Sequence, residues 1–194
     1  RFHVKLAYAD EVSNETYLGL SDADFRENPY RRYPASALDQ MKNHRTGITL
    51  GHEVEGPKGA FRVKTQIYRF DYQRTWRKLN RFGATDVASV LANPDDPSKA
   101  GYKAVLEGRI DGGSAANTLY IGPNRRTFVS QGVQSIVTTH ASTGKIEHKM
   151  EVGARFHYDQ IQRDHTEDGY TMSGGDLVPT DTGTLVTTRN VAST

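Results

Sequence analysis

The sequence predicts an all-β protein, and within that class a segment of a transmembrane antiparallel β-barrel with about five long strands and long loops. Three observations predict this fold class. Apolar and polar residues alternate with a period of two, several alternating segments are longer than the strands of soluble sandwiches, and short turns alternate strictly with long connections. No apolar run approaches the roughly 20 residues that a membrane helix needs, so a helical membrane protein is excluded.

The first two strands are expected at residues 1–10 and 45–55. In the first, Phe2 and Leu6 fall on one face and polar or small residues on the other. In the second, Leu50 belongs to a similar apolar series that alternates with glycine, threonine and glutamate. Helical spacing would mix these two sets of residues, whereas a strand separates them.

The third and fourth strands, at residues 60–79 and 126–141, alternate less regularly. In the third strand the apolar series changes phase between Ile67 and Tyr68. Either a β-bulge or an aromatic girdle at a membrane interface would produce this change. The fourth strand carries apolar groups on both faces.

The fifth strand, at residues 146–162, shows the clearest alternation. Met150, Val152 and Phe156 share one face, and Arg155 lies on the other. At about 3.3 Å per residue this strand is roughly 55 Å long, so it must project beyond a bilayer.

The connections between the strands also indicate a barrel wall. Tight turns are expected at residues 55–59 and 142–145, whereas residues 11–43, residues 80–126 and the chain from residue 163 onward form long connections. The short turns would all lie on one side of the membrane and the long loops on the other. The last residues, from Thr187 to Thr194, have the composition of a polar loop.

Three short helices are expected inside the long connections. Ser21 and Asp24 resemble a capping box that opens a helix, which Pro29 would end. The other two helices are expected at residues 86–92 and 98–107, with Gly108 at the C-terminal end of the last.

Composition sets limits on the chemistry of the chain. It contains no cysteine, so disulfides, thiolate metal sites and cysteine nucleophiles are excluded. This count is compatible with the cytosol and equally with a bacterial envelope protein. The formal net charge is +2 and the charges are mixed, which mildly favours an anionic partner and does not indicate nucleic acid.

Three stretches resemble one family. They are SNETYLGLSDADFRENPYRRY at residues 13–33, TQIYRFDYQRTWRKLN at residues 65–80, and VGARFHYDQIQRDHTEDGY at residues 152–170. In this order they resemble a long extracellular loop and two barrel strands of TonB-dependent outer-membrane receptors of the iron(III)-dicitrate type. The resemblance spans nearly the whole chain.

The resemblance implies a location and a function. Residues 1–194 are expected to form a middle part of the barrel domain, without the plug domain and the closing strands that members of this family have. The implied function is the energised uptake of a ferric chelate, either ferric citrate or another siderophore, across a bacterial outer membrane. The expected partners are the chelate, the outer-membrane lipid and, through the missing plug domain, TonB, with a monomeric barrel and no nucleic acid.

Arginine is the residue class that would suit such a ligand, because guanidinium groups bind carboxylates bidentately. The candidate substrate-binding residues are Arg31, Arg32, Arg125, Arg126, Arg155 and His157. The alternative interpretation is that these arginines only pair with carboxylates of the same wall. His157 and His165 could meet near a strand end, but solvated polar positions are the better interpretation of both, and no metal site or cofactor is expected.

Two alternative functions remain open from the sequence. One is a passive porin or a plug-less adhesin barrel; a plug domain with a TonB-contact segment in the upstream sequence would favour the receptor over it. The other is a soluble β-rich binding module with exposed loops. An enzyme is not expected, because the sequence contains no nucleophile elbow and no phosphate-binding loop.

Overall fold

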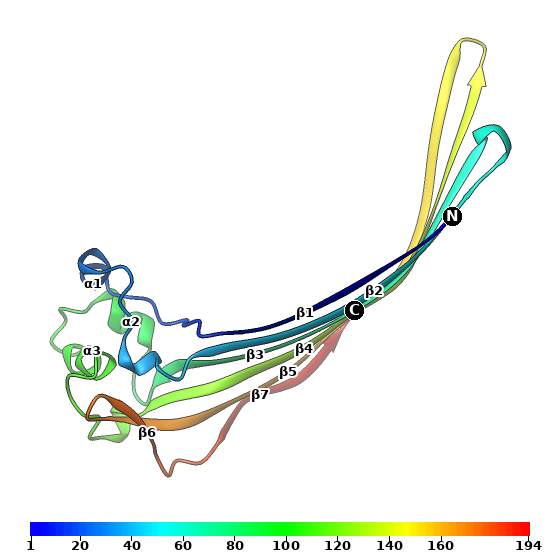
Figure 1. The fold of residues 1–194 in the computed structure, drawn as a ribbon. Coiled ribbons are helices and arrows are strands. Elements are labelled where there is room, and N and C mark those ends of the chain that lie inside the picture. Colours follow the sequence, from blue (N-terminus) through cyan, green and yellow to red (C-terminus); the bar gives the residue numbers. More distant parts are fainter.

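The computed structural model describes residues 1–194 as an all-β chain, with 60% of its residues in strands and 14% in helices. Its strands are β1 (Phe2–Ser13), β2 (Gln40–Glu55), β3 (Phe61–Phe82), β4 (Leu119–Thr143), β5 (Ile146–Ser173), β6 (Asp176–Pro179) and β7 (Leu185–Ser193). They form one open antiparallel sheet in the order β1-β2-β3-β4-β5-β6, and β7 also pairs with β5. Figure 1 shows a long curved ribbon with the helices at one end and the tight turns at the other.

All five expected strands are present, and the sheet contains two more. The expectation of a polar loop from Thr187 to Thr194 is wrong, because β7 pairs antiparallel with β5 over Gln160 to Glu167. The strand is rich in threonine and valine, whose branched side chains suit a pleated surface even where burial is slight. The sheet does not close on itself, so the barrel is not part of the observed architecture.

The change of phase after Ile67 does not come from a bulge. The register between β3 and β4 runs unbroken from Phe61 to Leu79 and shifts only between Leu79 and Arg81. Ile67 and Tyr68 therefore point to opposite faces of a regular strand. Both faces of β3 carry large apolar side chains here, and that produced the apparent jump.

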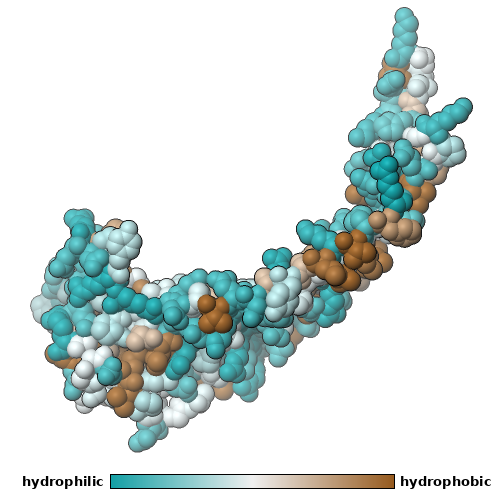
Figure 2. All heavy atoms as spheres, viewed as in Figure 1, coloured by the Kyte–Doolittle hydropathy of each residue, from teal (hydrophilic) through white to brown (hydrophobic).

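The register sorts the side chains into two faces with different chemistry. We call one the apolar face; it carries exposed hydrophobic side chains from all five long strands, which include Phe2, Val4, Leu6, Ile48, Leu50, Phe61, Ile67, Val133, Met150, Val152 and Phe156. Leu6 is 74% exposed and Phe156 is 72% exposed. In Figure 2, hydrophobic residues gather over the middle of the sheet, near the N-terminus. We call the opposite face, which carries Lys5, Arg74, Arg126 and His165, the polar face.

The three expected helices lie in the two long loops. They are α1 (Asp22–Glu27), α2 (Val87–Ala92) and α3 (Ala100–Leu106), accompanied by single 3₁₀ turns at Pro34–Ser36, Pro57–Gly59 and Ala115–Asn117. The Ser21 side chain accepts a hydrogen bond from the Asp24 amide, which confirms the expected N-cap. Gly108 follows α3 with φ = 67°, in agreement with its expected place at the helix end. None of these helices is long and apolar enough to cross a bilayer.

The hydrophobic core lies under these loops and not within the sheet. It consists of 13 buried residues, drawn from the first loop, from α2 and α3, and from the ends of β3, β4 and β5. Tyr33, Phe82, Val105, Leu119 and Met172 are among its members. Because both long loops contribute to one core, they form a single cap over this end of the sheet.

Candidate anion-binding site

A pocket on the polar face lies where the sheet meets the cap. Its volume is about 410 Å³, and most of its lining residues are polar or charged. The lining includes Tyr17 from the first loop, side chains of β3, β4 and β5, and Thr187 from β7. We call it the basic site and define it by Arg74, Lys78, Arg126 and His165.

Strand geometry brings the three cations together. Arg74 and Lys78 are four residues apart on β3, so their side chains point to the same face of the sheet. Arg126 on β4 is the register partner of Arg74. None of the three forms an ion pair with a carboxylate. The pKa of Lys78 is lowered by burial and by the charges of Arg126 and Arg74, although Asp39 acts in the opposite direction.

The pKa of Arg126 is lowered by the same two causes as that of Lys78, burial and neighbouring positive charges. For Arg126 these charges are those of Arg74 and Arg163. A group of like charges that only Asp39 partly offsets raises the free energy of the site, and a bound anion would lower it. The basic site therefore has the electrostatics of an anion receptor.

His165 completes the basic site as a neutral group. Arg126 donates a hydrogen bond from Nε to the Nε2 atom of His165 at 3.2 Å. Burial and the charges of Arg126, Arg163 and Arg74 lower the pKa of His165, while Asp164 raises it. At neutral pH the imidazole therefore accepts this hydrogen bond and adds no charge.

Aromatic rings form one wall of the basic site. Lys78 Nζ lies 3.7 Å from the centroid of the Tyr17 ring, and the Tyr17 and Trp76 rings meet edge to face at 5.2 Å. Arg74 lies 5.7 Å from the Trp76 centroid. Thr16 helps to hold Tyr17 there, because its hydroxyl donates to Asp39, which also accepts a hydrogen bond from the Leu79 amide.

Two hydrogen-bond donors at this wall have no partner. They are Nε of Arg74 and Nε1 of Trp76, and both atoms are buried. A buried donor without an acceptor costs about 1–3 kcal/mol. A ligand with carboxylate oxygens could supply acceptors to such groups.

The floor of the basic site contains one carboxylate, which is already neutralised. Glu167 is buried and lies 3.0 Å from Arg81 in an ion pair. Its other oxygen accepts a hydrogen bond from Asn80, and Asn80 accepts one from Asn124. Glu167 therefore does not cancel the charge of Arg74, Lys78 and Arg126.

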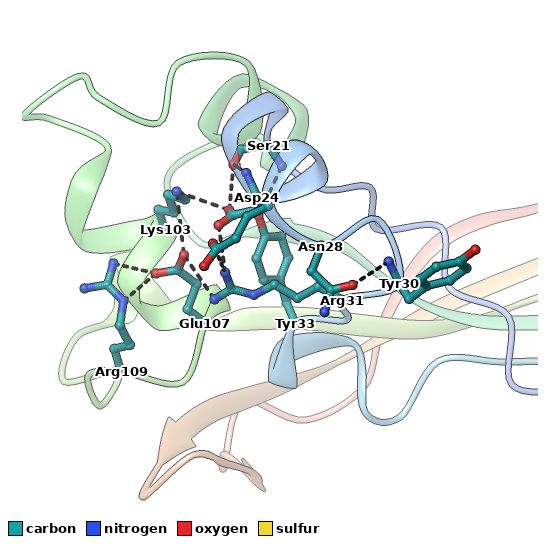
Figure 3. Close-up of polar contacts among 10 residues, drawn as sticks. Ser21, Asp24, Asn28, Tyr30, Arg31, Tyr33, Lys103, Glu107 and Arg109 are labelled. Atoms are coloured by element: carbon teal, nitrogen blue, oxygen red, sulfur yellow. Dashed lines mark hydrogen bonds and ion pairs between the residues drawn. The ribbon is translucent and has the colours of Figure 1, made fainter.

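Arg31 lies away from the basic site, in the polar network that joins the two long loops (Figure 3). Its guanidinium donates to Asp24 at 2.8 Å and lies 3.7 Å from Glu107. Asp24 also accepts hydrogen bonds from Ser21 at 2.6 Å and Tyr33 at 2.5 Å. We call Asp24, Arg31, Tyr33, Lys103 and Glu107 the loop clamp.

The loop clamp holds Asp24 in its charged form. Burial opposes that charge, but hydrogen bonds from Ser21, Tyr33 and Lys103 outweigh it and lower the pKa to about 2. Lys103 Nζ lies 3.2 Å from Asp24 and 3.6 Å from Glu107. Arg31 thus has a role in joining α1 to α3, and we leave it out of the basic site.

Arg32 is also occupied within the first loop. Its guanidinium donates to the carbonyl of Asn14 at 2.6 Å and to the hydroxyl of Ser36 at 2.8 Å. These contacts hold the start of the loop against its end. Arg32 is therefore placed to stabilise the cap and not to line the basic site.

The remaining candidates divide between the two faces. Arg126 belongs to the basic site, whereas its neighbour Arg125 points to the opposite face and is exposed. Arg155 and His157 also lie on the polar face, but farther from the cap, in the part of β5 nearer the tight turns. Both contact Tyr68 there. His157 and His165 do not meet, because they lie eight residues apart on β5, roughly 26 Å at about 3.3 Å per residue.

Sequence reasoning missed Arg74, Trp76, Lys78 and Tyr17. A signal for three of them was present, because Arg74, Trp76 and Lys78 alternate within one strand and must share a face. Their proximity to Arg126 depends on the strand register, which the sequence does not reveal. Tyr17 comes from a loop, and only the tertiary fold places it.

No three His, Asp or Glu side chains are grouped so that they would hold a metal ion. The chemistry of the basic site is the recognition of negative charge by guanidinium, ammonium and aromatic groups. Comparison of this chain with known protein families, with curated proteins and with solved structures gave no match.

Proposed function

We propose that this chain is part of the barrel wall of an outer-membrane TonB-dependent receptor for a ferric chelate. Its apolar face would contact lipid and its polar face would line the lumen. The supporting feature is the concentration of exposed hydrophobic side chains on one face of five adjacent strands. Along single strands this band extends for roughly 20–27 Å, comparable to the ~25 Å apolar band of membrane barrels.

The open edges of the sheet support the same proposal. β1 forms one edge of the sheet over its whole length. On the other side, β7 pairs with β5 only from Gln160 onward, so the part of β5 before Gln160 has no partner strand on that edge. Long, flat edges with apolar side chains invite pairing with further strands. In a barrel, those strands would complete the wall.

The observation that carries the ligand proposal is the unpaired group of Arg74, Lys78 and Arg126 on the polar face. A ferric chelate of citrate type presents several carboxylate oxygens around a bound ion. Guanidinium groups and the Trp76 indole would donate hydrogen bonds to these oxygens, and Lys78 would contribute a point charge. The ligand would be recognised without covalent chemistry.

The cap above the basic site would set access to it. Ligand would enter past the first loop, where Tyr17 lies against Lys78. Binding in the lumen would precede displacement of a plug domain by TonB, as the family resemblance implies. The residues of this chain would supply only the recognition step.

The ligand proposal can be tested with the fluorescence of one residue. Trp76 is the only tryptophan of the chain and lines the basic site. We expect ferric citrate to quench this fluorescence in a saturable manner. Arg126→Gln and Lys78→Gln should each weaken the apparent affinity by about 10-fold or more, since a charged hydrogen bond contributes roughly 1.5–3 kcal/mol.

Arg125→Gln is the matched control, because Arg125 is adjacent in sequence and points to the other face. We expect this variant to bind like the unmodified chain. Equal loss of affinity in Arg125→Gln and Arg126→Gln would indicate a nonspecific effect of net charge. Unchanged affinity in both basic-site variants would overturn the proposal.

A further inference from the structure

A second polar cluster lies lower on the polar face, across three strands. Tyr68 on β3, Gly132 on β4 and His157 on β5 are register partners in one line. A side chain at position 132 would place its Cβ only 2.6 Å from the Tyr68 hydroxyl. The glycine therefore leaves a gap through which Tyr68 reaches over β4 to His157.

The contacts form a continuous chain of hydrogen bonds. Tyr68 Oη lies 2.6 Å from Nδ1 of His157, and Nε2 of His157 lies 2.6 Å from Asp159 Oδ2. Because an ionised carboxylate only accepts, Nε2 carries a proton in this arrangement. With its proton on Nε2, the ring can accept hydrogen bonds at Nδ1, which faces both the Tyr68 hydroxyl at 2.6 Å and Nη2 of Arg155 at 3.1 Å.

Arg155 adds a positive charge to the same oxygen. Its Nη2 atom lies 2.8 Å and its Nε atom 3.2 Å from Tyr68 Oη, and both donate to it. Such donors stabilise negative charge that develops on the oxygen when its proton leaves. Tyr68 thus has a base, an orienting carboxylate behind that base, and a cation beside the oxygen.

Other tyrosines of the chain lack this combination. The Tyr33 hydroxyl donates to the carboxylate of Asp24, and Tyr170 accepts a hydrogen bond from Arg77. Tyr72 lies on the same strand and the same face as Tyr68, but it stacks on Phe128 and its hydroxyl forms no side-chain hydrogen bond. The cluster is therefore specific to Tyr68.

We propose that Tyr68, His157, Asp159 and Arg155 form an activated-tyrosine site that reacts with activated esters. The Tyr68 oxygen attacks the acyl carbon, its proton passes to Nδ1 of His157, and the bond from the acyl carbon to the leaving alkoxide or phenoxide breaks. Asp159 holds the imidazolium, and Arg155 stabilises the oxygen before attack. His157 then returns its proton, through water, to the leaving alkoxide or phenoxide. The products are an acylated Tyr68 and the released alcohol or phenol.

This site is separate from the basic site and does not depend on the proposed transport function. Tyr68 lies six residues before Arg74 on β3, roughly 20 Å away at about 3.3 Å per residue. In this arrangement Arg155 and His157 act on Tyr68 and not on a ferric chelate. The two roles can therefore be tested separately.

The experiment uses the full chain in detergent with p-nitrophenyl acetate. Release of p-nitrophenolate is followed by absorbance, and the acetylated residues are located by mass spectrometry of peptides. We expect Tyr68 to be acetylated on the order of 100-fold faster than Tyr72 at neutral pH, since a positioned general base contributes at least that factor. This ratio is measured within one molecule, so it needs no variant to fold.

Three variants separate activation from simple exposure. His157→Gln and Asp159→Asn should lower the acetylation rate of Tyr68 toward that of Tyr72, and Tyr68→Phe should remove the fast phase of p-nitrophenolate release. The rate at Tyr72 serves as the internal reference in each variant. Equal rates at Tyr68 and Tyr72 in the unmodified chain, or an unchanged Tyr68 rate in His157→Gln, would overturn the proposal.

Discussion

Arg126 donates a hydrogen bond to the Nε2 atom of His165 across the β4–β5 pair, at 3.2 Å. This contact requires an unprotonated Nε2, so the arrangement around the two residues fits a neutral imidazole. Arg74 and Arg163 add further positive charge near the ring. The basic site therefore places a titratable group where its protonation state responds directly to any bound anion.

The first prediction concerns the pH dependence of stability. Burial and the neighbouring arginines lower the pKa of His165 in the folded chain relative to about 6.5 in the unfolded chain. Between these two values the unfolded state binds more protons, so the free energy of unfolding falls as the pH falls below about 6.5. We expect His165→Gln to remove this component, as measured by denaturant unfolding between pH 7.5 and about 5.

The same titration reports on the ligand. An anion bound beside Arg126 would offset the arginine charges and raise the pKa of His165, which NMR of the imidazole protons would detect. The remaining histidines serve as internal controls, because none of them lines the basic site. If the ligand-free chain already shows an ordinary pKa for His165, the electrostatics described for this site would be contradicted.

The second prediction concerns the loop clamp. The Asp24 side chain is 8% exposed and the Lys103 side chain 16% exposed. Removing the carboxylate leaves Lys103 and Arg31 with Glu107, which Arg109 also pairs with, so two partly buried cations lose their nearest anion. We expect Asp24→Ala to lower the free energy of unfolding by about 3 kcal/mol. Thermal unfolding of the full chain in detergent measures this loss.

Asp22→Ala is the matched control for this prediction. Asp22 lies in the same helix and its side chain is 97% exposed, with Arg26 3.7 Å away. A surface ion pair of this kind contributes about 0–1 kcal/mol. Similar losses in the two variants would show that the loop clamp does not hold the cap together.

The third prediction concerns the end of α3. Gly108 has φ = 67°, and a Cβ atom there would lie 3.2 Å from the Pro34 side chain. We expect Gly108→Ala to destabilise the cap by roughly 1–2 kcal/mol because of the left-handed backbone. Gly101→Ala, within the same helix and with open space around it, should instead stabilise by about 0.5–1 kcal/mol. Urea unfolding compares the two, and a gain in stability from Gly108→Ala would refute the argument.

The elements that the sequence predicted correctly are those with local signals. Period-two alternation marked the five long strands, and the Ser21 cap and Gly108 marked helix ends. β7 was not predicted, because its threonines weaken the alternation of apolar and polar residues. It forms a strand by pairing with the free edge of β5, which the sequence does not reveal. The candidate site was only partly predicted, because the partners of Arg31 and the neighbours of Arg126 come from other strands and loops.

Of the candidate arginines only Arg126 lies in the basic site, and this outcome shows why sequence alone cannot tell a paired arginine from an unpaired one. Arg31 and Arg126 are alike in sequence, as members of arginine pairs near loops. Arg31 finds Asp24 and Glu107 within reach, whereas Arg126 meets only cations and a neutral imidazole. Whether a guanidinium is paired depends on contacts between distant segments, and no spacing rule encodes them.

The last prediction concerns which face of the sheet meets lipid. Leu6 and Lys5 are adjacent in β1 and point to opposite faces, and the chain has no cysteine of its own. Single variants Leu6→Cys and Lys5→Cys can therefore each carry one fluorescent label without background. In vesicles of brominated phospholipid we expect strong quenching of the label at position 6 and weak quenching at position 5, because only the apolar face would contact acyl chains. The same labelled chains in vesicles of unbrominated lipid provide the reference intensity. Equal quenching at both positions would mean that the sheet does not separate lipid from lumen, and the proposed barrel wall would then have to be abandoned.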